Sequence, residues 1–238
     1  AMNGNNEGQT MQDMTIPDGI GEVDAGWMTS VLQQSGSLSN NVSVASLEAT
    51  QVGQGVGLMG EIFVTTLTFD GDAADAPASV VVKLPSLDET SRSTGTTLRN
   101  YEREVKFYDH IAATVDIRVP HCHHAAWDEA TGDFVLVLED MAPAEQGDQV
   151  SGCGVEQART AVVELAQLHG PRWDDPTLGD HEFLSRRSGP EDVEQLVGLW
   201  AMFRPGFLAT YEQYLPPGGL ALLDDFGPRI GDWLDGRS

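Results

Sequence analysis

Three β-type segments follow one another in the first half of this chain, and no helical pattern lies between them. They cover residues 42–52, 62–69 and 79–84. Parallel strands need a long crossover, usually a helix, whereas strands joined by short loops pair antiparallel. The order of these segments therefore predicts an antiparallel meander and excludes a βαβ unit in this part of the chain.

Helical patterns flank the meander on both sides. One covers residues 24–34, where Asp24 can cap the helix and apolar side chains recur on one face. The other covers residues 98–113, again with an apolar face. The polar stretch before it, residues 85–95, is predicted to be a loop.

The pattern changes from β to α near residue 141. Two more β segments, at residues 122–127 and 134–138, come before this point, and every strong pattern after it is helical. Helices are predicted over residues 156–169, 191–215 with an interruption at Pro205-Gly206, and 220–234.

This order predicts an α+β fold with two lobes. We expect a disordered tail over residues 1–23, a β-rich lobe over residues 24–141 and a helical lobe over residues 142–238. A cleft between two lobes is a usual place for a ligand.

Charge and composition exclude several classes of partner. The formal net charge is −24, which argues against nucleic acid and against an anionic membrane, since both need a basic face. Cys122 and Cys153 are the only cysteines, so no disulfide framework is indicated. No apolar run is long enough to span a membrane, and the start of the chain lacks the pattern of a signal peptide. We therefore expect a cytoplasmic protein.

Lys83 is the first basic residue in the chain, and Lys106 is the only other lysine. It closes the apolar run Val80-Val81-Val82, so it ends a β segment. A lysine at the end of an edge strand is the ordinary alternative, but the scarcity of lysine favours a functional one that holds nucleotide phosphates. Such a lysine needs a carboxylate on the following helix, and we expect Glu104 to supply it. Glu102 is the other candidate, although with Lys106 it forms an i,i+4 pair typical of a helix surface.

Residues 55–60 spell Gly55-Val56-Gly57-Leu58-Met59-Gly60, a G-x-G-x-x-G motif. In a dinucleotide-binding fold such glycines open a helix, whereas in kinases they link two strands that cover the nucleotide phosphates. The residues after Gly60 are β-formers, which favours the kinase type. A plain glycine-rich hairpin is a further alternative. A helix after Gly60 would instead indicate a nicotinamide-dependent oxidoreductase.

The order of these motifs resembles the aminoglycoside phosphotransferase-like superfamily, and within it the ecdysteroid-kinase-like or choline-kinase-like branch. The resemblance covers roughly residues 25–175. It is carried, in chain order, by the glycine motif, Val80-Val81-Val82-Lys83-Leu84-Pro85, Tyr101-x-x-Glu104-Val105-x-Phe107-Tyr108, Val119-Pro120-His121-Cys122, Leu136-Val137-Leu138-Glu139-Asp140-Met141 and Leu165-Ala166-x-Leu168-His169.

The resemblance implies a protein-kinase-like fold, with a β-rich N-lobe that carries one regulatory-type helix and a partial helical C-lobe. It implies that ATP and Mg²⁺ bind between the lobes and that a hydroxyl of a small molecule is phosphorylated. Gly55, Gly57 and Gly60 would cover the phosphates, Lys83 would hold them and Glu104 would orient Lys83. The segment at residues 139–142, with Glu139 and Met141, would meet adenine through its backbone.

The catalytic loop of that family, His-Gly-Asp followed by Asn, has no match in this chain. His169-Gly170 is followed by proline, and both Asp225-Phe226-Gly227 and Asp232-Trp233 fall inside a helical pattern, which indicates chance matches. We therefore assign no catalytic residue and no metal ligand. The chain is expected to stop before the catalytic loop, to bind nucleotide weakly and not to turn over. A non-catalytic pseudokinase module that binds nucleotide or a partner is the alternative.

An incomplete helical lobe would also expose apolar helix faces, which favours self-association and leaves the oligomeric state open. The acceptor is open as well. The acidic composition fits a cationic amino alcohol or aminoglycoside, and a neutral hydroxylated lipid or sugar fits equally.

The run His121-Cys122-His123-His124 contains potential metal ligands. Because side chains alternate along a strand, only His121 with His123, or Cys122 with His124, should share a face. No second pair of ligands is evident, so the run is interpreted as the polar start of a strand.

Overall fold

The computed structural model describes residues 14–53, 59–145, 147–148, 151–185 and 189–235. The chain divides into two compact units, with the boundary in the sequence between Phe183 and Leu184. Each unit is described by itself.

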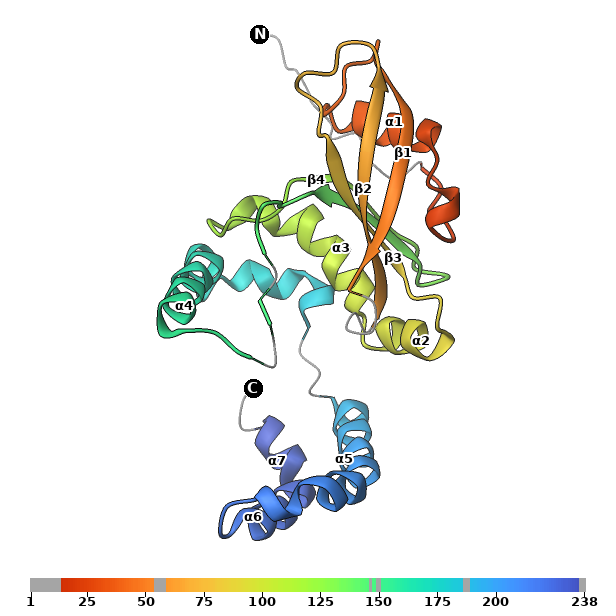
Figure 1. Cartoon of the computed structure of the whole chain (residues 1–238). Helices are drawn as coiled ribbons and strands as arrows, with labels where there is room; N and C mark the ends of the chain where they lie inside the picture. Colours follow the sequence, from red (N-terminus) through yellow and green to blue (C-terminus); the bar gives the residue numbers. More distant parts are fainter. Residues whose placement is uncertain (1–13, 54–58, 146, 149–150, 186–188, 236–238) are drawn as a thin grey trace. The chain divides into compact units, whose positions relative to one another are not determined.

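The first unit contains a five-stranded sheet in the order β1-β2-β3-β5-β4 (Figure 1). Its strands are β1 (Ser43–Val52), β2 (Gly60–Asp70), β3 (Ser79–Pro85), β4 (Cys122–Trp127) and β5 (Phe134–Glu139). Every neighbouring pair is antiparallel. The predicted meander is therefore confirmed, and the fold is α+β.

Helices α1 (Ala25–Gln34) and α3 (Asn100–His110) cover opposite faces of this sheet (Figure 1). Alternate side chains of β5 pack against these two different helices. Val135 and Val137 belong to the hydrophobic cluster that contains the buried face of α1. Leu136 and its alternate neighbours Phe134 and Leu138 belong to the cluster of α3. A strand covered on both faces reads as a continuous apolar run, as β5 does.

α1 follows its predicted pattern. The side chain of Asp24 accepts a hydrogen bond from the amide of Trp27 at 2.7 Å and so caps the helix. Met28, Val31 and Leu32 are buried on one face. Burial of each such side chain stabilises the fold by about 1.5–3 kcal/mol relative to exposure.

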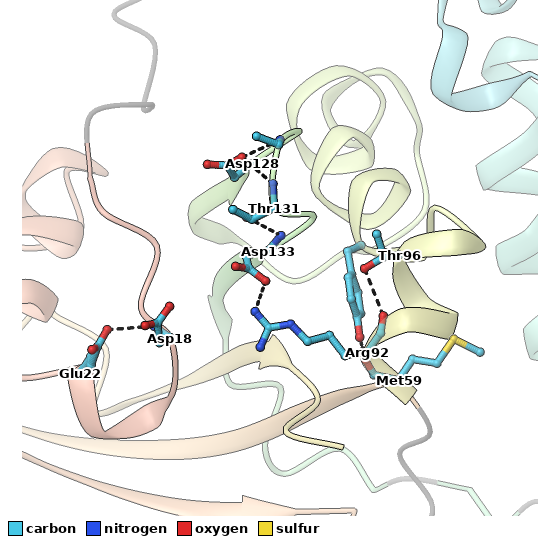
Figure 2. Close-up of polar contacts among 10 residues, drawn as sticks. Asp18, Glu22, Met59, Arg92, Thr96, Asp128, Thr131 and Asp133 are labelled. Carbon is cyan, nitrogen blue, oxygen red and sulfur yellow. Dashed lines mark hydrogen bonds and ion pairs between the residues drawn. The ribbon is translucent and has the colours of Figure 1, made fainter. Parts of the chain in front are cut away.

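Residues 14–23 correct the prediction of a disordered tail, while residues 1–13 lie outside the described ranges. A short 3-10 helix, η1, covers Ile20–Glu22, and the amide of Asp18 donates to Oε2 of Glu22 at 2.9 Å (Figure 2). Residues 14–23 have a defined structure because their apolar side chains pack: Val23 is buried, and Ile16 packs against the α1 cluster.

The predicted loop before α3 is wrong, because helix α2 (Glu89–Thr97) lies there. Asp88 caps it by accepting from the amide of Ser91 at 2.8 Å. Arg99, which has a left-handed φ of 57°, separates α2 from α3. The single helix expected over residues 98–113 is therefore shorter, and the 3-10 helix η2 (Ala112–Thr114) ends it.

The helical pattern after residue 155 is α4 (Val155–His169), close to its predicted bounds. The 3-10 helices η3 (Gly170–Arg172), η4 (Pro176–Asp180) and η5 (Glu182–Leu184) follow it. Three hydrogen bonds connect this segment to the region of α3. Nη1 of Arg172 donates to Oγ1 of Thr114 at 2.9 Å. The amide of Asp116 donates to the carbonyl of Gln167 at 3.1 Å, and Nε of Arg103 donates to the carbonyl of Phe183 at 3.0 Å. The lobe boundary expected between residues 141 and 142 stays a prediction.

The second unit is helical. It consists of α5 (Pro190–Tyr211), η6 (Glu212–Tyr214), α6 (Gly219–Phe226), η7 (Gly227–Arg229) and α7 (Ile230–Asp235). Within the described ranges, no helix is long and apolar enough to cross a membrane.

Two boundaries in the second unit differ from prediction. α5 continues through Pro205, where an interruption was expected. Proline removes one helical hydrogen bond, to the carbonyl of Ala201, and Ala201 is exposed, so water can hydrate that carbonyl. The helix predicted over residues 220–234 is instead divided, because Pro228 falls in η7, where it cannot donate to the preceding turn.

Candidate functional site

Lys83 lies in the interior of the sheet. It pairs with Ile62 of β2 and with Leu136 of β5, so β3 is not an edge strand and the edge-lysine alternative is wrong. Its neighbours Val82 and Leu84 belong to the α1 cluster. Because side chains alternate along a strand, Lys83 points to the opposite face, where α3 lies.

The ammonium of Lys83 forms an ion pair with the Oε1 atom of Glu104 on α3. Glu104, and not Glu102, is thus the carboxylate that meets Lys83, as the sequence predicted. The two side chains are 23% and 36% exposed. A lysine ammonium carries three hydrogen-bond donors, so this one can hold Glu104 and still reach a ligand from the solvent side.

Glu102 has a different role from the one expected. It does pair with Lys106, at 2.7 Å, and it also accepts from Nε of Arg99 at 2.6 Å. However, Glu102 is only 6% exposed, so the pair is not surface decoration. The hydrogen bond from Arg99 and the one from Lys106 lower the pKa of Glu102 to about 2, against the opposing effect of burial. The carboxylate therefore stays ionised between two cations.

The glycine motif joins two antiparallel strands. Gly55 and Gly57 lie outside the described residues, while Gly60 opens β2. A strand and not a helix follows Gly60, as the kinase type of glycine motif requires and contrary to the dinucleotide type. A Cβ atom on Gly60 would lie 2.9 Å from the carbonyl oxygen of Leu84, so glycine allows β2 to start this close to β3.

The predicted adenine-binding segment begins at the end of β5. The carboxylate of Glu139 accepts from Nη2 of Arg118 at 2.6 Å and from the amide of His121 at 2.9 Å. The bond from Arg118 is the larger cause that lowers the pKa of Glu139. The amide of Glu139 donates to the carbonyl of His121 at 2.8 Å, and the carbonyl of Met141 accepts from the amide of Ala144 at 2.9 Å. The amide of Glu139 and the carbonyl of Met141 therefore already have hydrogen-bond partners. An adenine contact through the backbone of Glu139 or Met141 stays a prediction.

The His121–Cys122–His123–His124 run follows the predicted alternation only in part: the rings of His121 and His123 do meet, with centroids 4.7 Å apart. A bulge interrupts the pairing of β4 with β5 between Cys122 and His124. As a result His123 and His124 both face the α1 side: Nδ1 of His123 lies 2.8 Å from Oγ of Ser37, and the ring of His124 meets that of Trp27. Cys122 instead packs in the α3 cluster. The expected shared face of Cys122 and His124 is therefore wrong, because the extra residue of the bulge reverses the alternation.

No three side chains of His, Cys, Asp or Glu come together as a metal site anywhere in the part of the chain that the structure describes. Asp225 lies at the end of α6 and pairs with Arg229 at 2.9 Å on an exposed surface. His169 ends α4 and is exposed.

The second unit contains an open hollow of about 550 Å³, beside the ion pair of Arg204 with Asp224. None of the predicted site residues lies in its lining, which consists of Val197, Trp200, Ala201, Arg204, Pro205, Asp224, Gly227 and Pro228. Of the predicted site residues, the structure joins Lys83 to Glu104, and Gly60 lies on the neighbouring strand opposite Pro85, two residues beyond Lys83. These three residues, Gly60, Lys83 and Glu104, are called the Lys83 site below.

A scan against protein-family models gave no match, and a search of curated proteins gave none either. The family resemblance drawn from the sequence motifs therefore stays a proposal.

Proposed function

We propose that this chain binds Mg-ATP at the Lys83 site and belongs to a small-molecule kinase of the aminoglycoside phosphotransferase-like superfamily, which phosphorylates a hydroxyl of its acceptor. The observation that carries the proposal is the ion pair of Lys83 with Glu104, which joins an interior strand to the helix on that face of the sheet. A cation held in this way is suited to nucleotide phosphates.

Burial and charge support this use of Lys83. A lysine kept in an interior strand loses hydration and side-chain freedom, and an ion pair that is about one-quarter to one-third exposed gives little stability in return. The net charge of −24 makes the surroundings of the protein unfavourable for a free polyphosphate. A positioned cation with spare donors offsets that repulsion locally.

The strand that follows Gly60 supports the kinase type of glycine motif over the nicotinamide-dependent oxidoreductase, for which a helix is needed. The α+β fold with an antiparallel sheet is compatible with a kinase-like lobe.

A non-catalytic nucleotide-binding module is the second candidate. The observation that favours it is that His-Gly-Asp does not occur in the sequence, where His169-Gly170 is followed by Pro171. Phosphoryl transfer needs an aspartate that accepts the proton of the attacking hydroxyl. Transfer of labelled phosphate from ATP to amino alcohols, aminoglycosides and hydroxylated lipids, measured on the protein that the whole gene encodes, separates the two: product supports the enzyme, and ATP binding without product supports the module.

Binding itself is tested by a thermal-shift titration with Mg-ATP. The unmodified chain should gain about 5 °C or more at a nucleotide concentration of roughly 100 times Kd. Lys83→Ala should weaken binding by about tenfold to a hundredfold, since charge-assisted hydrogen bonds to phosphate are lost. Glu104→Gln should act in the same direction with a smaller effect.

Lys106→Ala is the matched control, because Lys106 is the only other lysine and is also paired with a glutamate of α3. It should leave the Kd for Mg-ATP unchanged. If Lys83→Ala binds Mg-ATP as tightly as the unmodified chain does, the Lys83 site is not the nucleotide site.

A further inference from the structure

Tyr101 lies on α3 one turn before Glu104, and it is buried at the edge of the Lys83 site. It is 3% exposed, and its ring stacks on that of Phe134 with centroids 4.5 Å apart and planes inclined by 20°. Residues three apart on a helix share a face. Tyr101 and Glu104 therefore contact the same side of the sheet from adjacent positions.

The hydroxyl of Tyr101 contacts the chain at the start of β2. It donates a hydrogen bond to the carbonyl of Met59, the residue just before β2. Burial raises the pKa of Tyr101, and a hydrogen bond from the backbone of Ser86 opposes that rise. Gly60, the residue after Met59, pairs with Pro85, the last residue of β3. The phenol thus contacts the chain where β2 begins, opposite the end of the strand that carries Lys83.

Helix α2 encloses the ring from the other side. A Cβ atom on Gly95 would overlap the ring of Tyr101, so only glycine lets α2 approach this closely. Arg92 of α2 forms an ion pair with Asp133, the residue just before β5, and Figure 2 shows both side chains together with Met59. Tyr101 is therefore fixed by two helices and by β5 and cannot turn away from Met59 without moving one of them.

We propose that Tyr101 is a positioning residue of the Lys83 site: it fixes the start of β2 to α3, so that Gly60 and the Lys83–Glu104 pair keep one geometry. This inference rests on the proposed nucleotide binding. Glu104 belongs to α3, and the Met59 carbonyl is bound to α3 through Tyr101. A rotation of α3 would therefore displace Glu104 and the Met59 carbonyl together. Loss of the Tyr101 hydroxyl should therefore weaken nucleotide binding although the hydroxyl does not contact the nucleotide.

The test compares Tyr101→Phe with Tyr108→Phe in the full chain. Tyr108 is a second tyrosine of α3 that packs against the same cluster, so the same change there is a matched control. Amide hydrogen exchange without nucleotide should become about threefold to tenfold faster at residues 59–62 in Tyr101→Phe and not in Tyr108→Phe. The Kd for Mg-ATP should rise by a similar factor in Tyr101→Phe alone.

A double variant distinguishes positioning from a general loss of stability. If Tyr101 acts through Glu104, Tyr101→Phe combined with Glu104→Gln weakens binding by less than the product of the two single effects. Unchanged exchange at residues 59–62, an unchanged Kd despite faster exchange, or single effects that multiply would each overturn the role of Tyr101. Absence of Mg-ATP binding by the unmodified chain would instead overturn the proposed function, and the exchange result would still report on the contact with Met59.

Discussion

At the scale of single residues, His123 and His124 are nearly removed from water, with 5% and 1% of each residue exposed. Burial lowers the pKa of both side chains to about 4. His121 beside His123 adds to this effect and Glu139 opposes it, whereas burial alone acts on His124. Neither Nε2 atom has a hydrogen-bond partner among the described residues, so a proton added there would be a buried charge.

These two histidines predict a loss of stability in mild acid. Between pH 6.5 and about 4 the unfolded chain binds a proton at each site and the folded chain does not, so the free energy of unfolding falls as the pH falls. The fall reaches about 1.4 kcal/mol per pH unit for each histidine. Urea unfolding measured from pH 7 to pH 4 should show a shallower pH dependence in His124→Gln than in the unmodified chain.

His169→Gln is the control, since His169 is exposed at the end of α4. It should keep the pH dependence of the unmodified chain. Equal slopes for His124→Gln and the unmodified chain would show that His124 does not stay neutral in the folded state.

The Lys83 site and the histidine run show which side chains the sequence could place. Lys83 and Glu104 were predictable because a lysine that ends an apolar β segment and holds phosphates needs a carboxylate on the helix that follows. The directions of His123 and His124 were not predictable, because a single inserted residue at the bulge reverses the alternation and no local sequence pattern indicates the bulge. Tyr101 was visible only as a member of an apolar face, since its hydroxyl partner Met59 is distant in the chain.

At the scale of the helices and strands, α2 is stabilised by contacts with neighbouring parts of the fold more than by the helix propensity of its residues. Its sequence, ETSRSTGTT, consists mainly of Thr, Ser and Gly, which are weak helix formers. This composition explains why a loop was predicted. The helix nevertheless forms, because Asp88 caps it, Arg92 pairs with Asp133, and Gly95 closes on Tyr101. These last two contacts are tertiary, so no local pattern could reveal them.

Gly95→Ala should therefore have the opposite sign to the usual glycine-to-alanine change in a helix. Alanine normally stabilises a helix interior by up to about 1 kcal/mol relative to glycine. At Gly95 the added methyl would collide with the Tyr101 ring, and such overpacking should lower the free energy of unfolding by about 1–3 kcal/mol. Thermal unfolding followed by circular dichroism measures the change.

Gly198→Ala provides the comparison, because Gly198 of α5 is exposed and nothing lies within 4 Å of its added Cβ atom. That change should be neutral or stabilising. If Gly95→Ala also stabilises the protein, the ring of Tyr101 does not lie against α2 in solution.

At the scale of the whole molecule, the two units differ in how much core they contain. Among the described residues, the buried hydrophobic side chains lie in the first unit, with Ile230 as the exception. The second unit instead exposes many large apolar side chains: Leu184, Leu196, Val197, Leu199, Met202, Phe203, Phe207, Tyr211, Tyr214, Leu220, Leu222 and Trp233. The helices of the second unit were predictable from periodicity, but burial was not, since an apolar stripe indicates a face to be covered and not what covers it.

This difference predicts unequal behaviour of the two units when they are separated. A fragment of residues 1–183 should unfold cooperatively and keep the Lys83 site, because the sheet and both covering helices lie within it. A fragment of residues 184–238 should be partly helical without a cooperative transition, since helices in water depend on packing of their apolar faces. Circular dichroism during heating distinguishes the two.

A sharp transition in the smaller fragment at a concentration where it is monomeric would show that its few buried contacts are sufficient. A sharp transition that strengthens with concentration would show that copies cover one another's apolar faces, and Phe203→Glu should then abolish it.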